Sequence, residues 1–442
     1  HVSGSILMLP SIPDEIQEGI DAGITMVAGE VENRWGELLK DAYNNSLKPL
    51  YNLLNDQPSL AGAAAPFVSR ENLSFNGDSR QTSFDAGRGC PFKCSFCTII
   101  NVQGNTMRGR TPDDIEALIK RNQAQDMRGF FITDDNFARH PHWEEIADRI
   151  ISLKKKKRVT LMVQTDAMSY KIPRFVDKLA RAGCRRIFVG MESVNPENLK
   201  ACSKPQNRIS DYRAMLQAWR DASVVTHAGY IIGFPGDTYD SIMRDVERLK
   251  QELPIEFVEF TMMTPLPGSR DHLENYQKGV PMSKNMNDYD TCRPCMEHPM
   301  MSRDELIRAY RDAWKSFYSR KHVETILKRR KDRRQKNIAR DMIWFLSAVF
   351  AEDIHPFLFG IFRMKGRKKR SPRFRTESIP VYYCRRAWDI TYWTVRMIII
   401  FIEVKYLSFK ANRKKNDDYM DITITPEPRV EKTVLSKETS TS

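Results

Sequence analysis

The sequence predicts an α/β protein whose centre is a partial barrel of six parallel strand–helix units. Two observations support this prediction. After residue 80, short apolar, β-rich runs alternate with stretches of helical period, and start and stop signals for helices stand between the runs. Such alternation is typical of a parallel sheet covered by helices. Six units suit an open barrel better than a closed eightfold one, and in either the chemistry gathers at the carboxyl ends of the strands.

The expected strands are the apolar runs, and each expected helix follows its strand. The strands are residues 82–86, 129–133, 159–164, 186–189, 227–232 and 256–262. The first helix begins at Thr111-Pro112-Asp113-Asp114, where an N-cap, a proline at the first position and two acids precede apolar residues. Further helices are expected at residues 141–153, 172–182, 210–222 and 238–253, with Gly183 at a C-terminal cap position.

Five segments follow from this pattern. Residues 1–60 are expected to alternate strands (6–9, 25–27) and helices (13–22, 30–43), like the last part of a doubly wound domain. Residues 61–80 are expected to form a linker and residues 81–275 the barrel. Residues 276–415 are expected to form a mainly helical basic extension, and residues 416–442 a disordered tail. The chain starts at His1 and shows no charged n-region before an apolar stretch. We therefore expect no signal peptide and a start inside a longer protein.

The positive charge is concentrated in one region. The formal net charge is +14, and residues 321–415 hold 25 Lys/Arg against 8 Asp/Glu, a surplus of 17. Residues 416–442 are slightly acidic, so the balance of residues 1–320 is close to zero. We expect the barrel to carry the chemistry and the basic extension to serve attachment.

Three of the eight cysteines crowd into one short loop. Cys90, Cys94 and Cys97 lie in the segment GRGCPFKCSFC, just after the first predicted strand. Eight cysteines are too few for a disulfide scaffold in 442 residues, and the crowding indicates a reduced metal site. Spacings of four and three on a Gly- and Pro-containing loop can wrap a 4Fe-4S cluster and leave one iron open. A zinc site without its fourth ligand, or three buried thiols, are the alternatives.

This triad, with the aromatic Phe96 beside its last cysteine, resembles the radical S-adenosylmethionine (SAM) superfamily over residues 80–270. The resemblance implies that Cys90, Cys94 and Cys97 are metal ligands with a catalytic role and that Phe96 contacts the cofactor. It also implies that the amino and carboxylate groups of SAM chelate the fourth iron. One-electron reduction then splits the sulfonium into methionine and a 5′-deoxyadenosyl radical.

The second strand end offers candidate SAM contacts under this resemblance. Asp134, Asp135 and Asn136 follow the strand at the place where the family holds the methionine ammonium. A carboxylate there forms a charge-assisted hydrogen bond to the cation, and the choice between Asp134 and Asp135 stays open. The alternative is a strand-end turn with a helix cap. The family's usual Gly-Gly-Glu pattern is absent here.

Later strand ends complete the expected SAM pocket. Gln164 and Asp166 close the third strand, and Glu192 closes the fourth, where family members hold the ribose hydroxyls. An ion pair with Arg185 is the alternative for Glu192. Gly233 ends the fifth strand, where a glycine lets the backbone approach the adenine.

A narrower resemblance joins four segments to one subgroup. GFFITDDNFAR, AGCRRIFVGMESVNPENL, AGYIIGFPGDT and EFTMMTPLPGSRDH resemble radical SAM enzymes with an N-terminal cobalamin-binding domain, such as the anaerobic magnesium-protoporphyrin cyclase and hopanoid- and lipid-tailoring enzymes. Residues 1–51 resemble the end of that Rossmann-like domain. The resemblance implies cobalamin as a further cofactor of the full-length protein, with the contacting residues upstream of His1.

The remaining cysteines have simpler explanations. Cys292 and Cys295 form a CxxC pair with His298 three residues on, and the favoured interpretation is two reduced surface thiols. Half of a zinc or auxiliary-cluster site is the alternative. The isolated cysteines are expected to pack in apolar surroundings; they are Cys184, Cys202 and Cys384.

The basic extension alternates charge runs with apolar and aromatic stretches. The longest apolar stretch, residues 388–407, is interrupted by Arg396 and falls short of the roughly 20 apolar residues that a spanning helix needs. A helix lying in the headgroup region of an anionic membrane fits its aromatic and basic residues. A helical subdomain packed on the barrel and a nucleic-acid surface are the alternatives, and the apolar content makes nucleic acid the weakest of the three.

Together these features predict a radical SAM enzyme, a methyltransferase or oxidative cyclase, that methylates, cyclises or rearranges a hydrophobic biosynthetic intermediate. We expect a 4Fe-4S cluster, SAM and an electron donor such as ferredoxin or flavodoxin. The expected location is the cytoplasm, with peripheral contact at the inner membrane face through residues 321–415. The alternative is a tRNA- or RNA-modifying radical SAM enzyme, or an RNA-binding module, that holds phosphate with the extension. No RNA-binding fold signature accompanies it.

Overall fold

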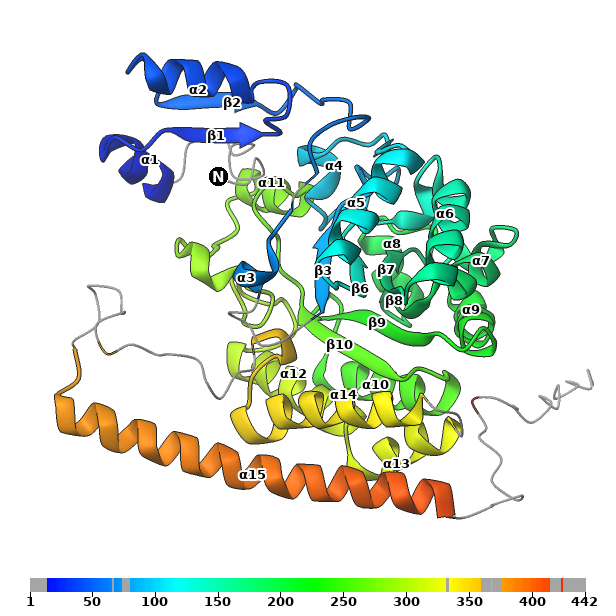
Figure 1. Cartoon of the computed structure of the whole chain (residues 1–442). Helices are drawn as coiled ribbons and strands as arrows, with labels where there is room; N and C mark the ends of the chain where they lie inside the picture. The colour runs from blue at the N-terminus through cyan, green and yellow to red at the C-terminus, as the bar shows by residue number, and fades with distance from the viewer. Residues whose placement is uncertain are drawn as a thin grey trace, which may run out of the picture.

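Figure 1 shows the computed structural model of the chain, which describes residues 14–65, 67–73, 80–330, 334–358, 367, 376–413 and 423. A sheet of six parallel strands forms its centre, and the strand order is β10-β9-β8-β7-β6-β3. The strands are β3 (Gln81–Phe84), β6 (Gly129–Ile132), β7 (Thr160–Thr165), β8 (Cys184–Glu192), β9 (Val225–Ile232) and β10 (Phe257–Met262). Because β3 and β10 are not paired with each other, the barrel is open, and the predicted partial barrel is confirmed.

Helices join successive strands and stand along the outside of the sheet (Figure 1). They are α5 (Pro112–Ala124), α6 (Trp143–Lys156), α7 (Phe175–Ala182), α8 (Pro196–Ala201), α9 (Ile209–Asp221) and α10 (Tyr239–Glu252), with 3-10 turns η3 (Phe137–Arg139) and η4 (Ser169–Lys171). Helix α5 begins with the expected cap, since Thr111 Oγ1 accepts from the backbone N of Asp114 at 3.2 Å and the Asp114 carboxylate accepts from the backbone N of Thr111 at 2.9 Å. Gly183 ends α7 with a left-handed φ of 106°.

Element boundaries differ from the predicted ones where backbone geometry overrides side-chain pattern. Strand β8 extends from Cys184 to Glu192, beyond the predicted residues 186–189, because pairing with β7 and β9 continues on both sides of that run. Helix α7 begins at Phe175, three residues later than predicted, because Arg174 has a left-handed backbone (φ 65°) that a helix cannot contain.

The N-terminal elements form a separate layer. Strands β1 (Met26–Gly29) and β2 (Leu50–Leu53) pair in parallel, with helices α1 (Asp14–Asp21) and α2 (Trp35–Tyr43) beside them. The predicted strand at 25–27 and helices at 13–22 and 30–43 correspond to β1, α1 and α2. Strand β2 was not predicted, nor was the short α3 (Arg70–Leu73) in the predicted linker. The predicted strand at 6–9 and all of the tail except residue 423 lie outside the described residues.

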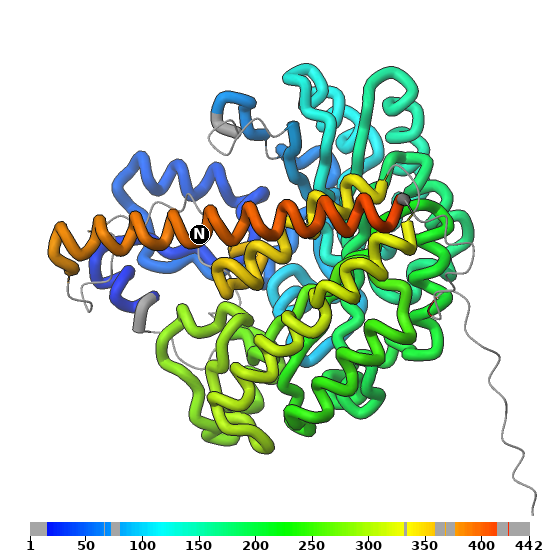
Figure 2. Tube along the Cα trace, turned by 90° about the horizontal axis from the view of Figure 1, so that it is seen from below, coloured from blue at the N-terminus to red at the C-terminus, as the bar shows by residue number. Residues whose placement is uncertain are grey.

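The C-terminal region is mainly helical, as predicted. It consists of α11 (Arg270–Gln277), η5 (Met286–Asp288), α12 (Arg303–Phe317), α13 (Arg320–Arg329), α14 (Gln335–Ser347), η6 (Ala348–Glu352), η7 (Pro356–Leu358) and α15 (Ile379–Arg413). Helix α12 packs on β10 and α10. Helix α15 packs on α13 and α14 and crosses the underside of the molecule (Figure 2). Among the described residues, none of the helices combines the length and apolar character needed to pass through a bilayer.

Candidate functional site

The carboxyl ends of the parallel strands meet at one edge of the sheet, and the predicted site residues lie at this edge or in the loop that follows β3. Two contacts join the ends of β6 and β7 directly. Gln164 Nε2 donates to the carbonyl of Asp134 at 3.3 Å, and Asn136 Nδ2 donates to the carboxylate of Asp166 at 3.0 Å. The parallel topology thus brings side chains together that are about 30 residues apart in the chain.

The cysteine loop, residues 89–98, is anchored by a short antiparallel hairpin of β4 (Gly87–Arg88) and β5 (Arg108–Gly109), with α4 (Ile99–Val102) between the strands. Gly89 opens the loop with a φ of 96°, and a Cβ there would lie 2.4 Å from the Thr106 carbonyl oxygen. Only glycine fits this turn, so the glycine before the first cysteine has a geometric cause.

Of the three cysteines of the loop, Cys94 is buried, and Cys90 and Cys97 are partly buried. All are free of disulfides. Burial raises the pKa of Cys90 and raises that of Cys97 to about 12, and negative charge on Cys94 and Asp135 adds to both shifts. Desolvated thiols of this kind become thiolates when a metal supplies compensating positive charge. The donor set therefore fits iron ligation.

Within the ranges that the structure describes, no three His, Cys, Asp or Glu side chains converge on a point where one metal ion could bind. Convergence on one ion is the geometry of a zinc site. A 4Fe-4S cluster is held differently, since each thiolate binds a separate iron of the cubane.

The two adjacent carboxylates after β6 have different surroundings. Asp134 is 1% exposed, and its Oδ1 accepts a 2.6 Å hydrogen bond from the backbone N of Ala86, which ties β6 to the chain entering the cysteine loop. Burial raises its pKa to about 7. Asp135 reaches solvent, but the protein around it raises its pKa to about 6, and its charge acts on Cys90 and Cys97. Asp135 is therefore the carboxylate that lies near the thiols.

Asp166 is occupied by protein groups. Arg139 donates to both of its carboxylate oxygens, at 2.8 and 2.9 Å, and the backbone N of Met168 donates at 2.8 Å. The Arg139 guanidinium also lies 5.3 Å from the ring centroid of Phe92 in the cysteine loop. Asp166 and Arg139 thus hold the loop after β7 against the cysteine loop. Sequence analysis did not single out Arg139, although this residue ends the segment GFFITDDNFAR.

Glu192 ends β8 in a strained backbone conformation. Its φ of 63° is left-handed, which is unusual for glutamate, and a bulge separates it from Gly190. Its carboxylate pairs with the ammonium of Lys204, so the alternative of an Arg185 partner is wrong. Lys204 also donates to the carbonyl of Gly190 at 3.0 Å. The bulge turns the Glu192 carboxylate toward the lysine and away from solvent.

Lys204 connects this pair to the cysteine loop. Its ammonium lies 5.9 Å from the ring centroid of Phe96. Burial alone would lower the pKa of Lys204, but the charges of Glu192 and Cys94 outweigh burial and raise it. Gln206 Nε2 lies 3.5 Å from the sulfur of Cys94. Sequence analysis missed Lys204 and Gln206, because nothing in the segment CSKPQN distinguishes a buried lysine from a surface one.

A cavity of about 750 Å³ opens beside the cysteine loop. Pro91, Phe92 and Lys93 line one wall, and residues of the 196–209 segment line the other. Its cationic lining residues are Lys93, Lys200, Lys204, Arg208 and Arg270. A cavity with this charge suits a ligand that carries a carboxylate.

Gly233 forms the turn after β9. Its φ is 90°, and the carboxylate of Asp237 accepts from the backbone N of Gly233 at 3.0 Å and of Phe234 at 2.9 Å. This turn lines a second cavity of about 310 Å³, together with Ser95 of the cysteine loop and the apolar Met263. The end of β9 and the cysteine loop therefore share one enclosed space.

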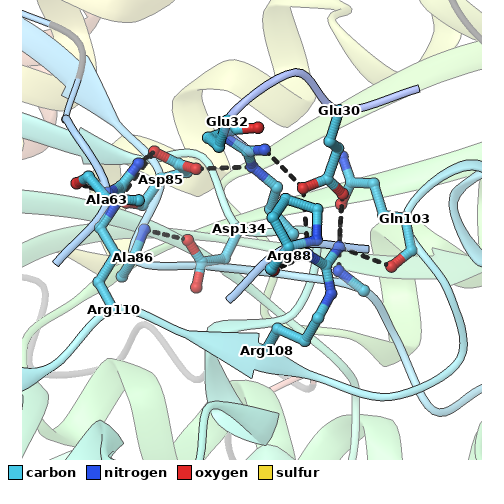
Figure 3. A network of polar contacts seen from close by, with 12 residues as sticks. Glu30, Glu32, Ala63, Asp85, Ala86, Arg88, Gln103, Arg108, Arg110 and Asp134 are labelled. Carbon is cyan, nitrogen blue, oxygen red and sulfur yellow. Dashed lines mark hydrogen bonds and ion pairs between the residues drawn. The ribbon is translucent and has the colours of Figure 1, made fainter. Parts of the chain in front are cut away.

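A network of ion pairs ties the hairpin to the N-terminal layer (Figure 3). Glu30, just after β1, contacts Arg88 at 2.7 Å and also Arg108, one arginine on each strand of the hairpin. Arg88 further contacts Glu32 at 2.6 Å and Asp85 at 2.8 Å. The N-terminal segment is thereby fixed to the base of the cysteine loop. Sequence analysis missed these residues, because the partners are far apart in the chain.

Two predictions about the other cysteines are wrong. Cys295 is 3% exposed and Cys292 is half buried beside Tyr310, because α12 and the chain around them cover this pair. Cys384 is exposed, because no side of α15 is buried along residues 379–396. Cys184 and Cys202 are buried, as predicted.

The family model of the radical SAM superfamily matches residues 86–249. This range begins before the cysteine loop and ends within α10, so it contains the cysteine loop and strands β6 to β9.

Two curated proteins illustrate the similarity. The chain is 25% identical over 292 residues to bacteriochlorophyllide d C-12(1)-methyltransferase of Chlorobaculum tepidum, covering 65% of this chain and 62% of that protein. It is 24% identical over 235 residues to the hopanoid C-2 methylase of Rhodopseudomonas palustris, covering 52% and 44%. The chain thus spans less than two thirds of the length of each.

A solved structure with a similar arrangement is the cobalamin-dependent S-adenosylmethionine radical enzyme OxsB with aqua-cobalamin and SAM bound. The TM-score is 0.46 at 14% identity, and the alignment covers 92% of this chain and 71% of OxsB.

The cysteine loop, the open parallel barrel and the family match agree. The radical SAM family uses a 4Fe-4S cluster and SAM, and the three free, desolvated thiols beside Asp135 are of the kind that such a cluster requires. Residues 86–249 therefore form a radical SAM domain.

Proposed function

We propose that this chain binds a 4Fe-4S cluster through Cys90, Cys94 and Cys97 and cleaves SAM reductively to start radical chemistry on a hydrophobic biosynthetic intermediate. The observation that carries the proposal is the position of Asp135 near the desolvated thiols, at the carboxyl edge of an open parallel barrel. An acidic group in that place suits a cosubstrate that is itself a cation.

Each part of SAM has a candidate partner of matching chemistry. The carboxylate of Asp135 holds the methionine ammonium. Gln164 and Glu192, at the ends of β7 and β8, offer polar groups to the ribose hydroxyls. The left-handed turn at Gly233 leaves room for the adenine, and the ring of Phe96 supplies an apolar contact to the cofactor.

The other residues predicted to contact SAM bond instead to protein groups in the loops that follow the strands. Asp134 is buried and holds the chain that enters the cysteine loop, and Asn136 and Asp166 bond to each other between the ends of β6 and β7. We propose that these three residues position the cysteine loop and Asp135. This proposal separates binding residues from positioning residues among neighbours in sequence.

The chemistry supplied by the bound cluster is transfer of one electron, which breaks a carbon–sulfur bond of SAM and leaves methionine and a 5′-deoxyadenosyl radical. The electron comes from a donor of the ferredoxin or flavodoxin class. The chain's own residues orient SAM.

We propose methyl transfer as the leading reaction, with oxidative ring closure or rearrangement as the alternatives. The similar proteins from Chlorobaculum tepidum and Rhodopseudomonas palustris are methyltransferases for a bacteriochlorophyllide and a hopanoid. Both are hydrophobic compounds. Cobalamin is the candidate methyl carrier, since the N-terminal layer is fixed to the hairpin by Glu30 and Glu32 and stands next to the cysteine loop.

The proposal includes a contact of the basic region 321–415 with a membrane surface, where hydrophobic intermediates are held. In this setting the protein is cytoplasmic and peripheral. The surplus of 17 positive charges in this region supports the contact.

Anaerobic reconstitution with iron and sulfide, followed by dithionite and SAM, tests the proposed chemistry. We expect release of 5′-deoxyadenosine, or of S-adenosylhomocysteine when a methyl group is transferred. Cys94→Ala should lose bound iron and both products, whereas Cys384→Ala, an exposed free cysteine on α15, should keep them. Absence of both products in the wild type, with unchanged iron in Cys94→Ala, would contradict the proposal.

A further inference from the structure

Helix α15 carries a continuous apolar surface on the side that faces away from the protein. The helix has 35 residues, which gives a length of about 52 Å at 1.5 Å per residue. One face packs on the body of the protein through Ile400, Val404 and Leu407, each less than 10% exposed. The opposite face carries apolar side chains that are more than 40% exposed.

The outward face is almost free of charge. Its large apolar side chains recur at spacings of three, four or seven positions, so they form one stripe along the helix. They are Trp388 (70% exposed), Val395 (52%), Ile398 (54%) and Ile402 (61%), with Ile399 and Tyr406 beside them. Ordinary protein surfaces expose apolar residues singly, whereas here they form one continuous apolar surface.

The half of α15 before Met397 runs past the edge of the body (Figure 1). Here aromatic residues are dense, and they include Tyr383, Trp388 and Tyr392, all more than 40% exposed. Tyrosine and tryptophan are the residues enriched at the boundary between headgroups and acyl chains.

Positive charges flank the stripe. The helix contains six Lys/Arg against two Asp/Glu. Lys405 is exposed at the border of the stripe, with its ammonium 5.3 Å from the ring centroid of Phe401. Arg396 and Lys410 turn back toward the body, where they contact the Phe350 carbonyl at 3.0 Å and Glu324 at 2.9 Å. Lys405 is therefore the cation that the structure shows at the edge of the stripe, whereas Arg396 and Lys410 are engaged by the body.

We propose that α15 lies in the plane of an anionic lipid bilayer, with the stripe through Trp388, Val395, Ile398 and Ile402 inserted among the headgroups. This inference deepens the proposed membrane contact and rests on it. An amphipathic helix of this kind sinks about 5–10 Å into the boundary of headgroups and acyl chains. The flanking cations then meet lipid phosphates.

A second copy of the chain is the competing occupant. Two copies that faced each other through α15 would bring together helices with a net charge of +4 each, inside regions with a surplus of 17 positive charges. Like charges across an interface oppose association, whereas an anionic surface attracts them. Charge complementarity therefore favours the bilayer.

Sedimentation of the chain of residues 1–442 with vesicles tests the inference. The probes are vesicles of phosphatidylcholine alone and vesicles of phosphatidylcholine and phosphatidylglycerol in equal parts. We expect binding to the anionic vesicles and at least tenfold weaker binding to the neutral ones. The double variant Ile398→Glu, Ile402→Glu should lose binding, because both side chains lie on the outward stripe.

The matched control is Leu39→Glu with Tyr43→Glu. These exposed apolar residues also lie four positions apart on a helix, α2, on the opposite side of the molecule (Figure 1). The control should bind as the wild type does. Lys405→Gln should weaken anionic binding by about fivefold, the effect of one charge near the surface.

Three results would overturn the inference. They are unchanged vesicle binding by the Ile398→Glu, Ile402→Glu variant, equal binding to neutral and anionic vesicles, and a wild-type dimer in vesicle-free solution that this variant dissociates. Formation of 5′-deoxyadenosine is measured without vesicles in the same preparations. Loss of vesicle binding with intact SAM cleavage separates a failure of the lipid contact from a failure of the proposed chemistry.

Discussion

The ammonium of Lys204 contacts the carboxylate of Glu192, and both residues are less than 10% exposed. The pair joins the strained end of β8 to the cysteine loop, since Lys204 also lies near Phe96 and is influenced by Cys94. A buried pair of this kind leaves an uncompensated charge when one partner is removed. Removing either partner therefore tests whether the pair is buried and stabilises the site.

We expect Lys204→Met to lower the free energy of unfolding by about 3–5 kcal/mol, because the Glu192 carboxylate then stays buried without its partner. Glu192→Gln should act in the same direction. The double variant should lose less free energy of unfolding than the two single variants lose together. Urea unfolding measures all three losses. The control is Lys171→Met, which breaks an exposed pair with Asp211 and should cost about 1 kcal/mol or less. Equal costs for the buried and exposed pairs would contradict the assignment.

Asp135→Asn should weaken SAM binding to the reconstituted protein by about ten- to hundredfold, since a hydrogen bond to a charged group is lost. Asp134→Asn should have a smaller effect, because the amide oxygen can still accept from the backbone N of Ala86. Titration calorimetry under anaerobic conditions measures both affinities. The reverse ranking of the two variants would show that Asp134 holds the ammonium.

SAM binding should depend on pH through Asp135. The surrounding protein partly desolvates the Asp135 carboxylate and raises its pKa to about 6 from 3.8, so the folded apo protein takes up this proton more readily than the unfolded chain. The resulting contribution to stability is present below about pH 4 and is lost as the pH rises through about 6. The affinity for SAM should change in the opposite direction and rise with pH over the same range, because only the ionised carboxylate binds the ammonium. Asp135→Asn should flatten the rise, and a wild-type affinity that falls there would refute this role.

Gly89→Ala should displace the cysteine loop. The residue has a left-handed φ, and an added Cβ would lie 2.4 Å from a backbone oxygen that cannot move independently. We expect a cost of about 1–3 kcal/mol in stability and a lower iron content after reconstitution. Gly36→Ala in α2, where a Cβ would meet nothing within 4 Å, is the control and should keep both properties. Full iron content in Gly89→Ala would show that the loop tolerates another geometry.

Glu30→Gln should make the cluster less stable without preventing folding. Its carboxylate holds Arg88 and Arg108 at the base of the cysteine loop, so its neutralisation leaves two arginines without this partner. The expected result is faster loss of the cluster's absorbance on exposure to chelator. Glu37→Gln, which removes an exposed pair with Arg34 in the same layer, should lose the cluster at the wild-type rate. If both variants lose the cluster at the same rate, Glu30 does not stabilise the cysteine loop and acts only within the N-terminal layer.

The parts of the site that could be predicted depend on local signals. The spacing of Cys90, Cys94 and Cys97 and the polar residues that follow each strand are visible in the sequence, and parallel strands must bring their carboxyl ends to one edge. The choice between Asp134 and Asp135 could not be made in this way. Adjacent residues after a strand point in opposite directions, and the backbone of the loop decides which one faces inward.

By itself, the sequence determined the six-unit open barrel, the cysteine loop and the basic apolar helix, because these follow from period, spacing and composition over short stretches. The tertiary structure decided which distant groups meet. It paired Lys204 with Glu192, fixed the N-terminal Glu30 to the hairpin, buried Cys295 and left the stripe on α15 outward. Such outcomes depend on long-range packing and on the desolvation of charges, which no local pattern encodes.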